Sequence, residues 1–288
     1  MSDKRVLGIL AGGGPLPARL AQAAFEQGWS VFIVGFEGFA DPTLIAPFPH
    51  KMLRLAAVKD IFSALREHGC SDVVLLGPVK RPAWRDLKPD SVGTRILMRL
   101  GRAVFLGDDG LLAGIVKILE EEGFRVRGAH EFLHQETHAK GVLGKVSVDQ
   151  QALCDIARAA QVLSVISSLD IGQGCVVQNG VVLALEALEG TDVMLQRCQP
   201  LKQDGPGGVL LKMPKSGQEL RADMPAIGPE TVRLARQASL RGIAFVSGMT
   251  LVINQIECIA EADQLGLFLY GMTLDELNRL SEKVGKSV

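Results

Sequence analysis

Net charge is almost absent from this sequence. Its 31 lysines and arginines face 32 aspartates and glutamates, which leaves a formal charge of −1 at neutral pH. Such a balance exerts no global attraction on nucleic acid or on an anionic membrane. We therefore predict no nucleic-acid partner and look for function in local clusters of side chains.

Cysteine motifs and long apolar runs are missing as well. The five cysteines are scattered, odd in number and without a CxxC pair, which argues against a disulfide framework and against a zinc site. The first apolar run ends at Gly12, and no later run approaches the ~18–20 residues that a membrane span needs. We expect a cytoplasmic protein, and peripheral contact with the cytoplasmic face of the inner membrane stays open.

The length and the apolar content predict two domains with a core each. The chain has 288 residues, of which 47% are hydrophobic, and single cores rarely serve chains of this size. Strands alternate with helices in the first half, which is typical of an α/β fold with a parallel sheet covered on both faces. We place the boundary where this alternation fades, giving domains at 1–130 and 131–288.

Hydrophobic patterns and turn residues give the expected elements. In the first domain we predict strands at 6–10, 30–35, 72–76 and 124–126, and helices at 16–27, 58–68, 84–100 and 110–122. The second domain is predicted to be mixed α+β: a helix capped by Asp149 and reaching 167, a hairpin turning at Asn179-Gly180, further strands at 209–213, 243–246, 251–253 and 267–269, and a last helix with a Thr273/Glu276 capping box.

A glycine-rich segment follows the first predicted strand. Gly12, Gly13 and Gly14 precede Pro15 and Leu16, where the first helix begins. Glycines at this position let the backbone approach a ligand, and the helix N-terminus offers N–H groups to a phosphate. The alternative is a tight turn that only packs the helix on the sheet. The spacing is not GxGxxG and no acidic residue ends the second strand, so a dinucleotide site is disfavoured.

A basic turn follows the strand that ends at residue 76. In a doubly wound sheet the carboxyl ends of the strands lie at the edge where ligands bind. Two adjacent cations at that edge suit a diphosphate, whereas the alternative is a solvated basic turn. The candidate residues here are Gly77, Pro78, Val79, Lys80 and Arg81.

The second domain holds the denser group of charges. Carboxylates and a threonine follow the predicted hairpin, and cations with a further aspartate follow the next strand. Hard oxygen ligands for Mg²⁺ or Mn²⁺ and cations for phosphate oxygens are what phosphoryl chemistry requires. The alternative is a charged surface loop. The candidates are Glu189, Thr191, Asp192, Lys212, Lys215, Gln218, Arg221 and Asp223.

Three histidines, His130, His134 and His138, recur at intervals of four residues and could share one helical face. Three imidazoles can bind zinc. Because glutamates and a glutamine are interleaved with them near the domain boundary, we favour a solvated helix and assign these histidines no role.

Taken in order, the segments GGGPLP, GPVKRP, EGTD and KSGQELRADMPAIGP resemble the UDP-2,3-diacylglucosamine pyrophosphatase family of lipid A biosynthesis, in the form unrelated to calcineurin-like phosphoesterases. The resemblance covers about residues 4–284. It implies hydrolysis of this lipid-bearing sugar nucleotide to UMP and 2,3-diacylglucosamine 1-phosphate with the help of a divalent cation, usually Mg²⁺. It also implies a Rossmann-like N-terminal domain, a separate C-terminal domain with a catalytic cleft between the two, and an essential aspartate at Asp223.

Together these observations predict a mechanism. Mg²⁺ bridges the diphosphate while Lys80, Arg81, Lys212 and Lys215 neutralise the charge that develops on it. Asp223 binds the metal or orients the attacking water, with Glu189 and Asp192 in support. The resemblance suggests attack at the sugar-side phosphorus.

Two other functions and the oligomeric state stay open. Leu10-Ala11-Gly12-Gly13-Gly14 followed by Arg19-Leu20 imitates the glycine loop of sugar-phosphate nucleotidyltransferases, although two prolines interrupt it. A non-catalytic protein that binds sugar nucleotides would share the same charges. A homodimer is compatible with the sequence, which does not specify one.

Overall fold

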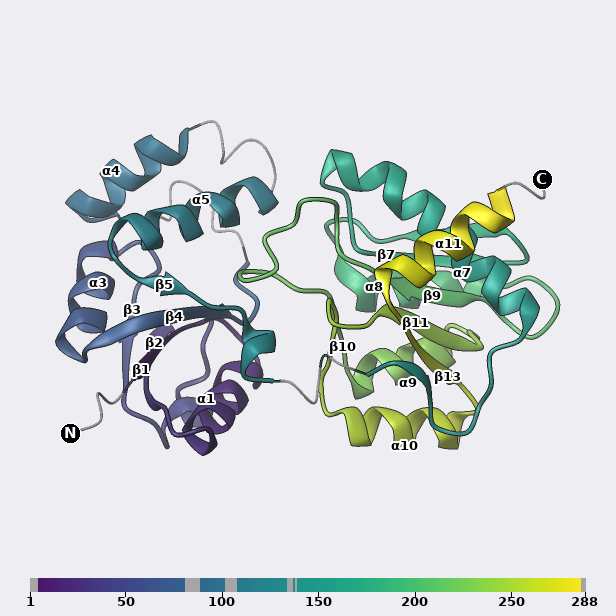
Figure 1. Ribbon diagram of the computed structural model, residues 1–288, viewed down its shortest axis with the longest axis horizontal. Coiled ribbons are helices and arrows are strands. Elements are labelled where there is room, and N and C mark those ends of the chain that lie inside the picture. The colour runs from purple at the N-terminus through teal and green to yellow at the C-terminus, as the bar shows by residue number, and fades with distance from the viewer. Residues whose placement is uncertain (1–4, 81–88, 102–107, 134–136, 138, 286–288) are drawn as a thin grey trace. The chain divides into compact units, whose positions relative to one another are not determined.

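The computed structural model describes residues 5–80, 89–101, 108–133, 137 and 139–285, and the chain forms two compact units (Figure 1). The N-terminal unit contains Met1–Leu133 together with Glu219–Asp223. The C-terminal unit contains His134–Gln218 and Met224–Val288. The short segment Glu219–Asp223 therefore belongs with the first unit, although its sequence neighbours on both sides belong to the second.

The N-terminal unit is built on a five-stranded sheet in the order β3-β2-β1-β4-β5, and all of its strand pairs are parallel. This is the strand order of Rossmann-like folds. The predicted α/β class with a parallel sheet is thus confirmed. The strands are β1 (Val6–Ala11), β2 (Ser30–Phe36), β3 (His50–Leu53), β4 (Cys70–Leu76) and β5 (Arg125–Val126).

Helices cover this sheet. They are α1 (Leu16–Glu26), α2 (Pro42–Ile45), α3 (Val58–Glu67), α4 (Ser91–Leu100), α5 (Asp108–Glu121) and the 3₁₀ helix η3 (Ala129–Glu131). Sequence patterns missed β3 because its HKML segment has no apolar run and its first two residues are exposed. The helix predicted from residue 84 begins at Ser91, where Asp90 caps it by accepting from the Gly93 N–H at 2.7 Å; residues 81–88 lie outside the described part.

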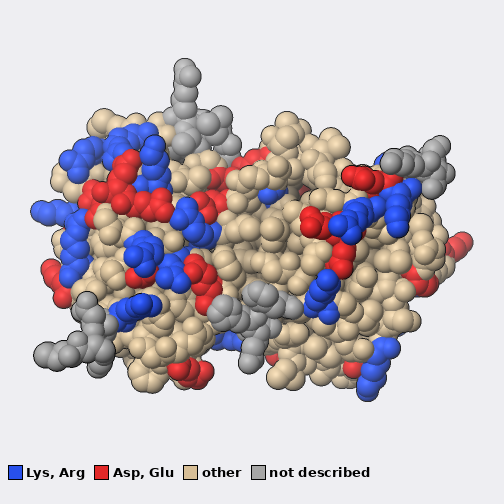
Figure 2. Space-filling model, in the orientation of Figure 1, with Lys and Arg blue, Asp and Glu red and all other residues tan. Residues whose placement is uncertain are grey.

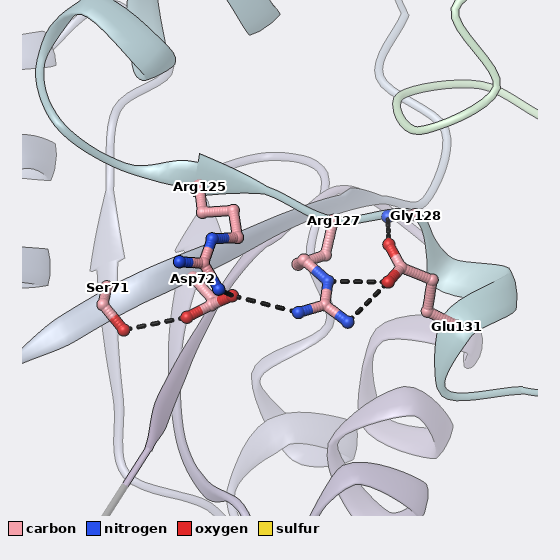
Figure 3. A network of polar contacts seen from close by, with 6 residues as sticks. All are labelled: Ser71, Asp72, Arg125, Arg127, Gly128 and Glu131. Carbon is pink, nitrogen blue, oxygen red and sulfur yellow. Dashed lines mark hydrogen bonds and ion pairs between the residues drawn. The ribbon is translucent and has the colours of Figure 1, made fainter. Parts of the chain in front are cut away.

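A polar network fastens the end of this unit to its sheet (Figure 3). Asp72, buried on β4, accepts from Ser71 at 2.8 Å and from Arg127 Nη1 at 3.3 Å. Arg127 Nε also donates to Glu131 Oε2 at 2.7 Å, and Glu131 Oε1 accepts from the Gly128 N–H at 2.8 Å. Burial acts to raise the pKa of Glu131, yet these donors hold it below its ordinary value.

Of the three histidines that could share a helical face, only His130 lies among the described residues. His130 lies in η3, a 3₁₀ turn whose C-cap is Phe132. The Phe132 ring packs edge-on against Trp29, with ring centroids 5.5 Å apart. His134 and His138 lie outside the described residues.

The C-terminal unit has a mixed six-stranded sheet in the order β6-β13-β11-β9-β7-β8, which confirms the predicted α+β character. Its centre, β9, β11 and β13, is parallel, and β6, β7 and β8 pair antiparallel with their neighbours. A small parallel pair joins β10 to β12. The strands are β6 (Gly141–Leu143), β7 (Gly174–Gln178), β8 (Val181–Leu185), β9 (Val209–Lys212), β10 (Ala226–Ile227), β11 (Gly242–Val246), β12 (Leu251–Val252) and β13 (Phe268–Met272).

The helices of this unit are α7 (Gln150–Ile166), η4 (Ser167–Leu169), α8 (Gly190–Cys198), η5 (Gln199–Leu201), α9 (Pro229–Gln237), α10 (Gln255–Leu265) and α11 (Leu274–Gly285). Asp149 caps α7 as predicted, accepting from the Ala152 N–H at 2.9 Å. The Asn179-Gly180 hairpin is also confirmed: both residues have positive φ, as a type I′ turn requires. Buried Asp155 holds this turn, accepting from the N–H groups of Gly180 at 2.8 Å and Asn179 at 3.2 Å.

One helical stretch, Gln150–Leu169, is long and apolar enough to cross a membrane by length and composition alone. Sequence patterns did not single it out, because Asp155 and Arg158 interrupt it. Its buried side chains pack against β7 and β9 within the core of the C-terminal unit. The core helix of a soluble protein passes the same test.

Candidate active site

Two loops meet at the carboxyl edge of the N-terminal sheet. The Gly12 N–H donates to the Leu76 carbonyl at 2.8 Å, and the Gly13 N–H donates to the Pro78 carbonyl at 2.9 Å. A Cβ at Gly12 would lie 2.3 Å from the Gly77 oxygen, so only glycine permits this approach. These two amides therefore join the loops to each other.

The remaining part of the glycine segment is more open. Gly14 has a φ of +76°, and a Cβ there would meet nothing within 4 Å. The first turn of α1 has no side-chain cap, and Pro15 and Pro17 carry no N–H. The amides available to an anion at this helix start are thus reduced to those around Leu16, at the same edge as the exposed side chains of Pro78, Val79 and Lys80. Arg81 lies outside the described residues.

The segment that carries Asp223 is folded as a single helical turn. The N–H groups of Ala222 and Asp223 both donate to the Glu219 carbonyl, at 2.9 and 3.0 Å. The Ala222 side chain packs against the core of the N-terminal unit. Asp223 is half-buried, and it belongs to the same compact unit as Gly12–Gly14 and Lys80.

Arg221 anchors this turn, and its guanidinium is paired with carboxylates. Its guanidinium donates to both carboxylate oxygens of Glu219, at 2.8 and 2.7 Å, and to Glu120 on α5 at 2.6 Å. The two acids raise the pKa of Arg221, and Arg221 in turn lowers the pKa of Glu219. Arg221, which the sequence analysis predicts to bind substrate, is thus paired with two carboxylates beside Asp223.

In the C-terminal unit, Glu186, Thr191 and Lys212 form a closed polar cluster. Lys212 Nζ donates to Glu186 Oε2 and to Thr191 Oγ1, both at 2.8 Å. The Thr191 hydroxyl donates to Glu186 Oε1 at 2.8 Å. Lys212 is only 3% exposed. The structure thus brings the predicted Thr191 and Lys212 together, around a glutamate that the sequence analysis did not assign although it immediately follows the hairpin.

The two other carboxylates of this segment have different surroundings. The pKa of Asp192, in the first turn of α8, is raised by burial and by the nearby Glu230 and Glu186, while Lys212 acts to lower it. Exposed Glu189 is paired with Arg197, whose Nε and Nη2 lie 3.0 and 2.6 Å from Glu189 Oε1, and the pairing lowers the pKa of Glu189. Glu189 therefore interacts with Arg197 rather than with the buried cluster.

Lys215 and Gln218 form a turn after β9. The Lys215 N–H donates to Gln218 Oε1 at 2.9 Å, the Gln218 N–H donates to the Lys215 carbonyl at 3.2 Å, and Gly217 has a φ of +77°. The Lys215 ammonium forms an ion pair with Asp170. The predicted metal ligands do not gather within a unit: in the part of the chain that is described, no three His, Cys, Asp or Glu side chains are placed to hold a metal ion.

On the face shown in Figure 2, basic and acidic side chains are interleaved, as the net charge of −1 leads one to expect. Charge pairs occur within each unit, among them Arg66 with Glu122 and Arg233 with Glu261. Recognition of an anion thus depends on the local groups described above.

Comparison with known proteins gives consistent results over the whole chain. The model of the LpxI N-terminal domain matches residues 6–135, and the model of the LpxI C-terminal domain matches residues 139–270. A protein of Caulobacter vibrioides named UDP-2,3-diacylglucosamine pyrophosphatase LpxI is 42% identical over 278 residues, which cover 94% of this chain and 99% of that protein.

Comparison with solved structures gives only weak likenesses. CobK precorrin-6A reductase covers 98% of both chains at 14% identity, with a TM-score of 0.32. Phosphoribosylglycinamide formyltransferase from Anaplasma phagocytophilum, 24% identical, covers 29% of this chain and 44% of its own, with a TM-score of 0.23. Likenesses this weak support no conclusion about fold or function.

Proposed function

The chain belongs to the LpxI family, and on that basis we propose that it hydrolyses UDP-2,3-diacylglucosamine to UMP and 2,3-diacylglucosamine 1-phosphate in lipid A biosynthesis. The observation that carries this proposal is the relative of that name, 42% identical over nearly the full length of both chains. Water adds across the P–O–P bridge: its oxygen stays on one phosphate product, and the bridging oxygen leaves with the other.

Asp223 is proposed as the central carboxylate. It lies in the R-x-D-x-P stretch, at the end of a helical turn that Arg221 fixes through Glu219 and Glu120. A carboxylate held in this way can accept a proton from water or bind a metal ion without having to be ordered first. Exposed Lys80, at the carboxyl edge of the sheet in the same unit, is proposed to bind phosphate oxygens, with Arg81 beside it in the sequence.

Magnesium or manganese is proposed as the cofactor. Mg²⁺ is usually held by one or two carboxylates together with substrate phosphates, so the donor set that fits it need not include three acidic side chains. Asp223 is the carboxylate of the N-terminal unit that we propose as a metal ligand, and Asp192 is the separate candidate within the C-terminal unit. The ion would polarise the phosphate oxygens and offset the charge that develops on them.

The C-terminal residues are proposed to contribute differently from the sequence-based scheme. Lys212 is buried and paired with Glu186, and Lys215 is paired with Asp170. A lysine ammonium has three N–H groups, so a phosphate bound by either lysine would share it with that carboxylate. We propose the enzyme to be cytoplasmic and to meet its lipid substrate at the membrane surface.

The test is release of UMP from UDP-2,3-diacylglucosamine by the purified protein, with Mg²⁺, with Mn²⁺ and with EDTA. We expect metal-dependent release, and in H₂¹⁸O the label should appear in the sugar phosphate if the sugar-side phosphorus is attacked. Binding without UMP release would contradict the proposal in favour of a binding protein. Pyrophosphate release from a nucleoside triphosphate and a sugar phosphate would favour a nucleotidyltransferase.

A further inference from the structure

We infer that Glu186 is a positioning residue of this hydrolase: with Lys212 and Thr191 it fixes the first turn of α8, and with it the Asp192 carboxylate. The inference rests on the proposed function. The observation that supports it is a buried charge pair, because folding by itself does not require such a pair. Taking two charges out of water costs free energy, and apolar replacements of such pairs are often neutral or stabilising.

The geometry of the pair is specific. Lys212 Nζ and Thr191 Oγ1 each contact Glu186 at 2.8 Å and each other at 2.8 Å, so the three side chains close a ring. Thr191 is the second residue of α8, directly before Asp192. Because Thr191 is held by both charges, the direction in which α8 begins is fixed by the ring.

A second contact fixes the same turn from its other side. Arg197, near the end of α8, pairs with Glu189 and donates to the carbonyl of Leu185, the last residue of β8. The first turn of α8 is thus held by Thr191 on one side and by Glu189 on the other. Asp192 follows Thr191 directly in the first turn of α8, so the ring and Asp192 share that turn.

The sheet is shaped to admit Glu186. Its N–H donates to the Gly174 carbonyl at 2.9 Å, and Gly174 pairs across the sheet with Lys212. A Cβ at Gly174 would lie 2.6 Å from Glu186 Oε2 and 3.4 Å from Lys212 Cδ. The ring lies where β9, a parallel strand of this sheet, reaches its carboxyl end, which is where α/β sheets bind ligands.

Kinetics of Glu186→Gln on UDP-2,3-diacylglucosamine test this role. Losing a residue that orients a metal or catalytic group typically costs 10–100-fold. We expect kcat to fall by about that factor, with KM changed less than about threefold, because the substrate-binding groups remain. Glu186→Asp should restore part of kcat. A folded Glu186→Gln protein with kcat within threefold of wild type would overturn the inference.

Two further variants separate positioning from stability. Glu186→Gln/Lys212→Met removes both charges, so it should regain the melting temperature lost in Glu186→Gln but not kcat; recovery of kcat would show a purely structural pair and overturn the inference. Gly174→Ala displaces the Glu186 carboxylate with every charge retained, and it should lower kcat in the same direction. Unchanged kcat in that variant would also count against the inference.

The matched control is Asp155→Asn. Asp155 is another buried carboxylate of the same unit, and it holds the hairpin turn at the opposite end of β7. We expect a changed melting temperature with unchanged kcat; an equal loss of kcat would overturn the inference. If the wild-type protein itself releases no UMP, the proposed function fails and the inference with it, whereas an active wild type with an unaffected Glu186→Gln variant refutes the inference alone.

Discussion

At the scale of single residues, the clamp beside Asp223 is the feature with the clearest consequence. Arg221 bonds both oxygens of Glu219, and this fork geometry fixes direction as well as distance. The carbonyl of Glu219 accepts from the Asp223 N–H, so the clamp and the carboxylate share one turn. Asp223 is therefore held in place by contacts that do not involve its own carboxylate.

Asp223→Ala should lower kcat by about 10²- to 10⁴-fold, the range for a positioned acid–base group. Substrate affinity should survive, because the turn and the cations remain. Steady-state kinetics and equilibrium binding of the substrate measure the two effects. Asp60→Ala, an exposed aspartate on α3, is the control and should keep full activity. Turnover within threefold of wild type in Asp223→Ala would remove Asp223 from the mechanism.

The types of residue at the candidate site were easier to predict than the residues with which they pair. The charged segments around Asp192 and Asp223 are evident in the sequence because hard oxygen ligands and cations are concentrated there. However, Arg221 pairs with Glu120, 101 residues away, and Lys212 with Glu186, 26 residues away. Pairing at such separations depends on the tertiary fold, so the sequence could not show which cations already have a carboxylate.

At the scale of elements, close backbone approach explains the glycine loop better than phosphate binding alone does. Gly12 and Gly77 touch because neither has a side chain, and Gly77 has a φ of +97°. Gly14 differs: its φ is positive but the space around it is open. Gly12 thus permits close contact between two loops, whereas Gly14 supplies a left-handed backbone conformation. The sequence motif alone does not distinguish these two roles.

Gly12→Ala and Gly14→Ala should therefore behave differently. The first forces two loops apart and should cost more than 2 kcal/mol of the free energy of unfolding, roughly the level reached by overpacking. The second adds only the left-handed backbone cost of about 1–2 kcal/mol. Thermal or urea unfolding of both variants compares them. If Gly14→Ala proves the more destabilising, the close approach of the two loops is not the reason for the glycine at position 12.

The capping box of α11 predicts a dependence on pH. The Thr273 N–H donates to Glu276 Oε2 at 2.9 Å, and Lys140 lies 3.0 Å from Glu276 Oε1; these contacts lower the pKa of Glu276 from 4.5 to about 2. A lowered pKa means that the contribution is present above pH 4.5 and is lost as the pH falls toward 2.

Glu276→Ala should lower the melting temperature at neutral pH by about 1–3 °C, the size expected for a lost cap. The difference from wild type should shrink through the interval from pH 4.5 to 2 and vanish below it. Melting curves across this range measure it. A difference that stays constant down to pH 2 would show that the ionised carboxylate contributes nothing.

Signals between residues close in sequence predicted the turns and helix caps of the C-terminal unit. The Asn179-Gly180 turn, the Asp149 cap and the Thr273/Glu276 box work through neighbours in sequence, so their outcome did not depend on the rest of the fold. The helix α8 was missed, because its glycine, threonine and aspartate at the start are typical of a loop and its stability comes from Thr191 and Arg197 bonding to other elements.

At the scale of the whole molecule, the N-terminal unit is completed by a segment from far along the chain. Arg221 reaches Glu120, and Ala222 packs on the core of that unit. No periodicity or composition marks Glu219–Asp223 as belonging there, since the segment is short and charged. The sequence thus indicated two domains without showing that the first one is discontinuous.

A fragment of residues 1–133 should accordingly be less stable than the same unit in the full chain. A synthetic peptide of residues 216–226 should raise the melting temperature of the fragment, and a peptide with Ala222→Asp should not, because a charge cannot replace the partly buried methyl group that packs on the core. Circular dichroism melts with each peptide measure this. Equal melting temperatures with and without the wild-type peptide would show that the segment adds nothing.

The discontinuous N-terminal unit also affects the order of events on the ribosome. Domains normally fold as they emerge, N-terminal first, at about 5–20 residues synthesised per second. Here the unit is completed only when Glu219–Asp223 have been synthesised, a delay of roughly 5–20 s after Leu133 at that speed. During this interval the nascent unit exposes the part of its core that Ala222 will cover. Slow synthesis between these two points would therefore extend the time for which a chaperone is needed, whereas codons read quickly there would shorten it.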